Sequence, residues 1–217
     1  MDKQPDNRNH RQEGRLMKEP IILFGCGGHA RSVLDILHTN KVKNKIILVD
    51  KNAKENEQIM GHDVLKYYTP QNTSKLFPAT GTNKNREKLL LHFGEKNFIS
   101  IISCTAHISE NVSTKAGTLV SHRAFLGTGV QTGLCCIINT GTIIEHEVEI
   151  GNYVHIAPGC IICGRSRIGN HVLLGAGSTV IDNITICDHV TTGAGSIIIQ
   201  DITVPGTYAG VPARKIR

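Results

Sequence analysis

Residues 138–160 read INTGTIIEHEVEIGNYVHIAPGC, a stretch rich in isoleucine and valine that does not alternate as an ordinary strand does. Taking every sixth residue gives an unbroken series of 18 positions from Ile102 to Val204, of which 15 are aliphatic and three are threonine. A period of six residues held this long is typical of a parallel β-helix built from hexapeptides. Three hexapeptides would form one triangular coil of 18 residues, with the aliphatic side chains pointing inward.

The residues before this repeat have a different pattern. Short apolar segments at 20–25, 45–50, 77–82 and 98–103 predict strands, and residues 26–40 predict a helix between the first two. A second helix is expected at 83–94, opened by Asn83 as its cap and closed by Gly94. Strands that alternate with helices indicate a small parallel, Rossmann-like α/β unit.

These patterns predict a chain of four parts. We expect a disordered tail at 1–18, the α/β unit at 19–103, the hexapeptide β-helix at 104–204 and a C-terminal tail at 205–217. The polar start has no apolar segment of the kind found in secretory signals.

Composition narrows the classes of partner. The formal net charge is +6, but no basic block is interleaved with aromatic residues, so we expect no nucleic-acid partner. No apolar segment approaches the length of a membrane span, so no membrane partner is expected either. Seven scattered cysteines, an odd number, suggest reduced thiols and a cytoplasmic location.

A family resemblance follows from the order of the motifs. The chain contains LFGCGGHARSVLDIL at 23–37, VD at 49–50, GTNKNREKL at 81–89, NTGTIIEHEVEIGNYVHIAPG at 139–159 and GVPAR at 210–214. It therefore resembles the nucleotide-amino-sugar N-acetyltransferases and sialic-acid O-acetyltransferases, which are left-handed β-helix acyltransferases. The resemblance implies a homotrimer that uses acetyl-CoA as co-substrate, without a tightly bound cofactor or metal. It also implies that the N-terminal unit binds a nucleotide-sugar, with a UDP-sugar favoured, and that active sites lie between subunits in an enzyme of bacterial surface glycan or nonulosonate biosynthesis.

The same resemblance assigns catalysis to His146, with Glu147 beside it. An imidazole has an ordinary pKa near 6.5 and can accept the proton that an attacking amine must lose. Because Glu147 is the adjacent residue, it would point to the opposite side of a regular strand. The pair therefore requires a turn in the chain, and Glu145 is the alternative partner.

The acetyl-CoA site is expected from the resemblance and from the coil period. His155 follows His146 by nine residues, half of a coil, so the two can share a site only if two subunits meet there. Gly164 follows His146 by 18 residues and should lie one coil above it, with its N–H available to the thioester oxygen. The predicted acetyl-CoA-binding residues are Asn139, His155, Gly164, Ala176 and Ala194.

The glycine-rich segment at 25–31 follows a strand and opens a helix, where backbone N–H groups can bind phosphate. It departs from the dinucleotide pattern because Ala30 occupies the third glycine position. Asp50 ends the second strand and can accept hydrogen bonds from a ribose or base. For Arg86, exposure to solvent is a nearly equal alternative. The predicted nucleotide-sugar-binding residues are Gly25, Gly27, Gly28, His29, Arg31, Asp50, Asn83 and Arg86.

Three other functions remain open at this point. An O-acetyltransferase of a sialic-acid-like sugar would need stronger base assistance, because its acceptor is a hydroxyl group. A non-catalytic trimeric scaffold that binds sugar nucleotides is a second alternative, and a metal-dependent hydratase is a third. Cys160 and Cys163 have zinc-like spacing, but without a partner pair their packing in the coil explains them better.

Overall fold

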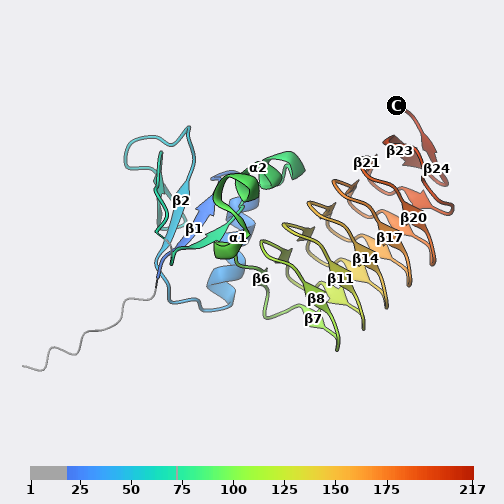
Figure 1. The fold of residues 1–217 in the computed structure, drawn as a ribbon, viewed down its shortest axis with the longest axis horizontal. Helices are drawn as coiled ribbons and strands as arrows, with labels where there is room; N and C mark the ends of the chain where they lie inside the picture. The colour runs from blue at the N-terminus through green and yellow to red at the C-terminus, as the bar shows by residue number, and fades with distance from the viewer. Residues whose placement is uncertain (1–18, 72) are drawn as a thin grey trace, which may run out of the picture.

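The computed structural model describes residues 19–71 and 73–217. It contains an N-terminal α/β unit followed by a long solenoid of stacked coils (Figure 1). The tail predicted at 1–18 lies outside the described residues. No described helix has both the length and the apolar character needed to cross a membrane.

The N-terminal unit is built on a five-stranded sheet. The central strand β1 (Ile21–Phe24) pairs in parallel with β2 (Ile46–Val49) on one side and β5 (Lys75–Phe77) on the other. β4 (His62–Leu65) adds in parallel to β2, and the edge strand β3 (Gln58–Ile59) is antiparallel to β4. The carboxyl ends of β1, β2 and β5 therefore meet at one edge, where ligands bind in sheets of this kind.

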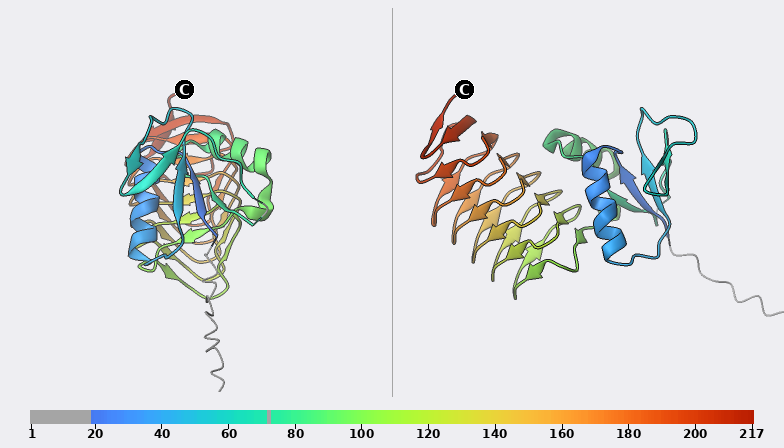
Figure 2. Two further views of the ribbon diagram at one scale, coloured as in Figure 1. Left: turned by 90° about the vertical axis from the view of Figure 1, so that its left-hand side faces the viewer. Right: turned by 180° about the vertical axis from the view of Figure 1, so that it is seen from behind.

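Two helices cover opposite faces of this sheet. Side chains alternate along a strand, so Ile21 packs with α1 (Gly28–Thr39) and the next residue, Ile22, packs with α2 (Asn83–Phe93). The views in Figure 2 show the helices on either side of the strands. A short 3₁₀ helix (Glu95–Asn97) leads from α2 toward the solenoid.

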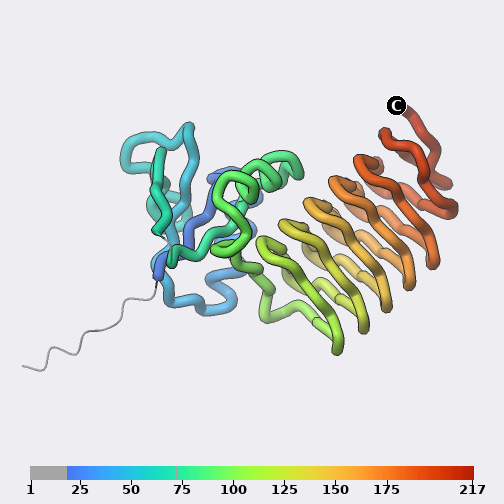
Figure 3. Tube along the Cα trace, viewed as in Figure 1, coloured from blue at the N-terminus to red at the C-terminus, as the bar shows by residue number. Residues whose placement is uncertain are grey.

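The solenoid has the predicted period of 18 residues. Ile143 pairs with Ile161 and Ile144 with Ile162, and the same step joins neighbouring coils in all three sheets as far as β22. At the last coil the step is 16 residues, with Ile186 paired to Ile202 and Val190 to Gly206. The coils stack regularly along the solenoid (Figure 3). The first sheet contains β7 (His107–Ile108), β10 (Phe125–Leu126), β13 (Ile143–Ile144), β16 (Ile161–Ile162), β19 (Thr179–Val180) and β22 (Ile197–Ile198). The second sheet contains β8 (Ser113–Thr114), β11 (Gln131–Thr132), β14 (Glu149–Ile150), β17 (Arg167–Ile168) and β20 (Thr185–Ile186). The third sheet contains β6 (Ile101–Ile102), β9 (Leu119–Val120), β12 (Ile137–Ile138), β15 (His155–Ile156), β18 (Leu173–Leu174), β21 (Val190–Thr192), β23 (Gly206–Gly210) and β24 (Ala213–Lys215).

The predicted inward residues form the solenoid core. Leu126, Ile138 and Ile144 are fully buried, as are most other members of the six-residue series. The exceptions are at the two ends. Ile102 and Ile108 are each 37% exposed and Thr114 is half-buried, because they lie on the edge strands of the first coil. Val204 is 51% exposed because the register shifts by two residues at the last coil, where Ile202 pairs with Ile186 and is buried instead, so the prediction that Val204 points inward is wrong.

The two parts of the chain share their apolar core. Leu119 and Ile137 point outward from the third sheet, yet they are at most 1% exposed because the α1 side of the N-terminal unit covers them. On the α2 side, Cys135 and Tyr153 belong to the same cluster as Ile22. The N-terminal unit therefore rests directly on the solenoid, next to the coils that carry the candidate site.

Three predicted elements differ in their bounds. The strand expected at 77–82 is β5, which ends at Phe77 because Pro78 follows and has no N–H for a ladder. Of the segment 98–103, only Ile101–Ile102 forms a strand. The cap of α2 is Thr82, and Asn83 is the first residue of the helix.

The hairpin of β3 and β4 was not predicted. Its two-residue turn consists of Met60 and Gly61, both with positive φ, at 50° and 81°. Two such residues match the mirror-image turns that join twisted strands. Methionine is not a usual signal for this turn, and each strand is too short to show a pattern.

Candidate active site

His146 lies at a corner of the solenoid, between β13 and β14. The next residue, Glu147, has a left-handed backbone with φ of 58°, which is the turn that the pair requires. The carboxylate of Glu147 consequently folds back toward the ring, with His146 Nδ1 3.2 Å from Glu147 Oε2. A proton on Nδ1 can be donated to this carboxylate, which leaves Nε2 free to accept another. Glu145, the alternative partner, forms neither a hydrogen bond nor an ion pair with the ring.

The ring of His146 packs directly on Gly164 in the next coil. A Cβ atom at position 164 would lie 2.5 Å from His146 Cε1 and 2.6 Å from Nε2, closer than real Cβ atoms approach other heavy atoms. Glycine therefore makes room for the ring. No backbone acceptor is recorded within the described residues for the Gly164 N–H, so this donor is available beside the imidazole.

A second cluster is centred on His155, on the third sheet. Asn139 Nδ2 lies 3.3 Å from His155 Nε2. His29, the second residue of α1, approaches from the N-terminal unit, with its ring centroid 6.4 Å from that of His155. His29 Nε2 is buried and has no hydrogen-bond partner among the described residues. His146 is not part of this cluster, so one chain presents the two halves of the predicted site separately.

Both histidines of this cluster are held neutral. Burial lowers the pKa of His155 to about 4, helped by the positive charge of Arg86 and opposed by a hydrogen bond to the Gly81 carbonyl. Burial also lowers the pKa of His29 to about 3, with smaller contributions from His155 and Arg86. Near neutral pH each ring therefore keeps one nitrogen as a hydrogen-bond acceptor.

Gly25, the first residue of the glycine-rich segment, and Asp50 line a cavity of about 490 Å³ at the carboxyl edge of the sheet. Gly25 has φ of 121°, and a Cβ there would lie 2.6 Å from the carbonyl oxygen of Ala79, so only glycine fits. Gly27 and Gly28 are exposed at the start of α1, as is Arg31, and none of these three lines the cavity.

Most of the residues that line this cavity were not predicted. Three lysines and a tyrosine surround it, which suits a phosphorylated ligand with a planar ring. The sequence held a signal for some of them, namely their place just after a strand. Lys51 and Asn52 follow Asp50 at the end of β2, and Thr80 lies three residues after the end of β5. Lys66 and Tyr67 follow β4, a strand of the hairpin that the sequence did not predict. The lining residues that sequence reasoning missed are Lys51, Asn52, Lys66, Tyr67, Thr80, Asn85, Lys88, Phe24, Val49 and Leu89.

The predictions for Arg86 and Asn83 require correction. Arg86 was expected beside a phosphate or uracil, or in solvent, but it is 1% exposed and bonded to protein oxygens. Asn83 donates to the backbone oxygens of His171 and Val172, at 2.9 and 3.3 Å. Both residues thus connect α2 to the solenoid and lie outside the cavity that contains Asp50.

Ala176 and Ala194 occupy equivalent positions at another corner of the solenoid, one coil apart. Both are exposed, and Gly195 N donates to Ala176 O at 2.8 Å. Their small side chains leave this corner open along two successive coils.

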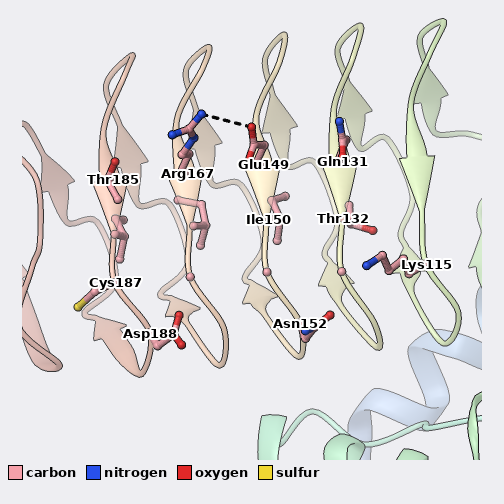
Figure 4. A pocket seen from close by; sticks show the side chains of 15 residues that line it. Lys115, Gln131, Thr132, Glu149, Ile150, Asn152, Arg167, Thr185, Cys187 and Asp188 are labelled. Atoms are coloured by element: carbon pink, nitrogen blue, oxygen red, sulfur yellow. Dashed lines mark ion pairs between the residues drawn. The ribbon is translucent and has the colours of Figure 1, made fainter.

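A further groove, of about 450 Å³, crosses the second sheet. Figure 4 shows its polar rows, in which Arg167 Nη2 lies 3.6 Å from Glu149 Oε1. None of the predicted site residues lies in it. Nor do the described residues contain a group of three or more histidine, cysteine, aspartate or glutamate side chains arranged to hold a metal ion.

Two protein families match parts of the chain. Residues 20–92 match the PglD N-terminal domain, and residues 165–200 match the bacterial transferase hexapeptide repeats. Among curated proteins, uncharacterized protein L142 of Acanthamoeba polyphaga mimivirus is 33% identical over 116 residues. That match covers 52% of this chain and 23% of the viral protein, so the chain spans less than a quarter of this relative.

Solved structures match nearly the whole chain. The acetyltransferase domain of PglB from Neisseria gonorrhoeae FA1090 has a TM-score of 0.85 at 24% identity, covering 91% of this chain and 100% of that one. A mutant GDP-perosamine N-acetyltransferase from Caulobacter crescentus, in complex with CoA and GDP-perosamine, has a TM-score of 0.84 at 25% identity, covering 92% and 98%. WeeI from Acinetobacter baumannii AYE has a TM-score of 0.68 at 20% identity, covering 91% and 100%. The predicted fold, an α/β unit followed by a left-handed β-helix, is thereby confirmed.

Proposed function

The chain joins a PglD N-terminal domain to the hexapeptide repeats of the left-handed β-helix acyltransferases, and on this premise we propose that it is an acetyltransferase. Its donor is acetyl-CoA, and its acceptor is the 4-amino group of an amino-deoxy sugar linked to a nucleotide. The observation that carries the proposal is the His146–Glu147 pair, held at a turn with its ring on Gly164. Among the solved relatives, the Caulobacter enzyme is described in complex with CoA and GDP-perosamine.

In the proposed reaction the amine nitrogen attacks the thioester carbonyl carbon, and the carbon–sulfur bond breaks to release CoA. His146 Nε2 accepts the proton that the amine loses, while Glu147 stabilises the imidazolium. The free N–H of Gly164 supports the developing oxyanion. Direct transfer, without an acyl-enzyme intermediate, is favoured because burial raises the pKa of the thiol of Cys163, the residue before Gly164, and the negative charges of Asp182 and Glu145 raise this pKa further.

The acceptor nucleotide is proposed to occupy the cavity at the carboxyl edge of the sheet. Lys51, Lys66 and Lys88 suit the diphosphate, and Tyr67 offers a planar surface to the base. We favour a UDP-sugar and a role in bacterial surface glycan or nonulosonate biosynthesis in the cytoplasm. Incubation with acetyl-CoA and a panel of UDP-, GDP- and dTDP-4-amino sugars tests this, with release of free CoA thiol as the readout. Failure of every member to release CoA would contradict the proposal.

Asp50→Ala is expected to raise the KM for the nucleotide-sugar roughly tenfold or more, because a hydrogen bond to a charged group is lost. The KM for acetyl-CoA should stay nearly unchanged in steady-state assays. Asp50 Oδ1 also accepts from Asn52 N at 2.9 Å, so Asp50→Asn separates the loss of charge from the loss of this local bond. Asp63→Ala, an exposed carboxylate of the same sheet outside the cavity, is the matched control. An equal rise in both KM values would contradict the assignment of the cavity to the acceptor.

A homotrimer is proposed because the two halves of the site are separate in one chain and one solenoid face is apolar. The outward side chains of the first sheet form a row along successive coils: Phe125, Ile143, Ile161, Thr179 and Ile197. All but Thr179 are apolar, and Ile143 and Ile161 are 38% and 37% exposed. A second copy packed against this row would remove it from water.

Mixing inactive subunits tests shared sites. His146→Ala and His155→Ala proteins are each expected to be nearly inactive. After refolding together in equal amounts, about a quarter of the sites should regain both residues, since each contributor is intact in half of the subunits. Activity after mixing and mass by light scattering are the measurements. A stable monomer with full activity would rule out the shared site.

A further inference from the structure

Arg86 is a buried cation that the proposed mechanism does not use. Its side chain is 1% exposed, and burial lowers its pKa to about 10, so it remains charged near neutral pH. No carboxylate of the described residues lies within ion-pair distance of it. A buried charge without an ion pair is costly unless hydrogen bonds compensate for the lost water.

The compensation comes from five protein oxygens on two parts of the chain. Nε and Nη2 donate to solenoid carbonyls, and Nη1 and Nη2 donate to acceptors at the start of α2. The distances are 2.6 Å to Cys135 O, 2.9 Å to Tyr153 O, 3.1 Å to Val154 O, 2.8 Å to Gly81 O and 2.9 Å to Asn83 Oδ1. A planar guanidinium provides such a fixed set of donors, which an ammonium group does not.

Two of these acceptors lie next to His155. Val154 directly precedes it in the chain, and Gly81, whose carbonyl accepts from Arg86, lines the same cavity as His155. Arg86 thus bonds to the backbone that carries His155 and to a carbonyl beside its ring. We propose that Arg86 is a positioning residue for the acetyl-donor site, holding the start of α2 on the solenoid and thereby fixing the position of the His155 ring.

The guanidinium also affects the charge of the site. Its positive charge helps to lower the pKa of both His155 and His29, after the larger effect of burial. A neutral His155 keeps one ring nitrogen as an acceptor, and its Nε2 lies 3.3 Å from Asn139 Nδ2. The inference rests on the proposed function, because it takes His155 to face the acetyl donor.

The experiment compares Arg86→Met, which removes the charge, with Arg86→Lys, which keeps the charge and loses the planar donors. Lys75→Met, which removes an exposed cation from the same unit, is the control. In each full-length protein, NMR titration follows the ring signals of His155, and steady-state assays give kcat and both KM values. Thermal unfolding establishes that each variant is folded.

In Arg86→Met the pKa of His155 is expected to rise from about 4 toward its ordinary value, because the nearby positive charge is gone. The KM for acetyl-CoA should rise roughly 10- to 100-fold through displacement of the ring, with a smaller effect on the KM for the nucleotide-sugar. Arg86→Lys should keep the low pKa yet show the raised KM. Lys75→Met should resemble the wild type in every measurement.

An unchanged His155 titration in folded Arg86→Met, or wild-type kinetics in both variants, would overturn the proposal. If neither variant folds, Arg86 serves the fold and the positioning role is equally overturned. The titration needs no turnover, so the link between Arg86 and His155 is decided even if acetyl-CoA proves not to be the donor. In that case only the proposed function fails.

Discussion

His146→Ala is expected to lower kcat by about 10²–10⁴-fold while leaving the affinity for both substrates nearly unchanged. The side chain is 46% exposed at its corner, where it lies against Gly164 and Glu147, so its removal leaves no cavity in the core. The loss should be incomplete. Positioning of the two substrates and the oxyanion contact from the Gly164 N–H would persist in the variant.

The pH dependence of kcat provides an independent test of this role. A general base acts only in its unprotonated form, so any acid-side fall of the wild-type rate that depends on this base should disappear in His146→Ala. His155 and His29 cannot produce such a fall near neutral pH, because burial lowers their pKa values to about 4 and 3. A variant with near wild-type kcat would remove His146 from the mechanism, whatever its pH profile.

Gly164→Ala is expected to lower kcat roughly 100-fold, which is the effect of displacing a catalytic group by about 1 Å. The backbone at position 164 does not require glycine, since it has no positive φ. The new Cβ would instead lie 2.5 Å from His146 Cε1, so the ring must move. The fold should tolerate this movement because the ring is at the surface, and the thermal unfolding temperature should change little.

The double variant His146→Ala/Gly164→Ala separates the two possible roles of Gly164. If alanine acts by moving the ring, it should cause little further loss once the ring is absent. If the N–H of Gly164 is disturbed as well, a second loss should add to the first. Equal kcat for Gly164→Ala and the wild type would show that the close packing of the ring on this glycine has no catalytic consequence.

Glu147 illustrates what the sequence leaves open about a site. Adjacency predicts that its side chain points away from His146, and only a turn at that residue reverses this. The left-handed backbone at Glu147 provides the turn, at a place where the repeat puts a corner in every coil. Glu145, one residue before His146, is adjacent to it in the same way and forms neither a hydrogen bond nor an ion pair with the ring.

The sequence alone determined the coil and everything that repeats with it. The 18-residue step predicted that Gly164 lies above His146. The same step separates His171 from His189, whose rings are stacked with centroids 4.9 Å apart and planes 6° apart. This prediction succeeds because each coil of a solenoid contacts only its neighbours, so positions in space follow from differences in residue number.

Only the tertiary structure decided how the N-terminal unit meets the solenoid. The burial of Arg86, the approach of His29 to His155 and the lysines of the cavity were not predicted. The first two depend on where α1 and α2 rest on the coils, which is set by a shared apolar core from segments far apart in the chain. The lysines depend on how β2, β4 and α2 come together within the N-terminal unit. No period relates these segments, and an arginine on a polar helix looks the same in sequence whether it faces water or a set of carbonyl oxygens.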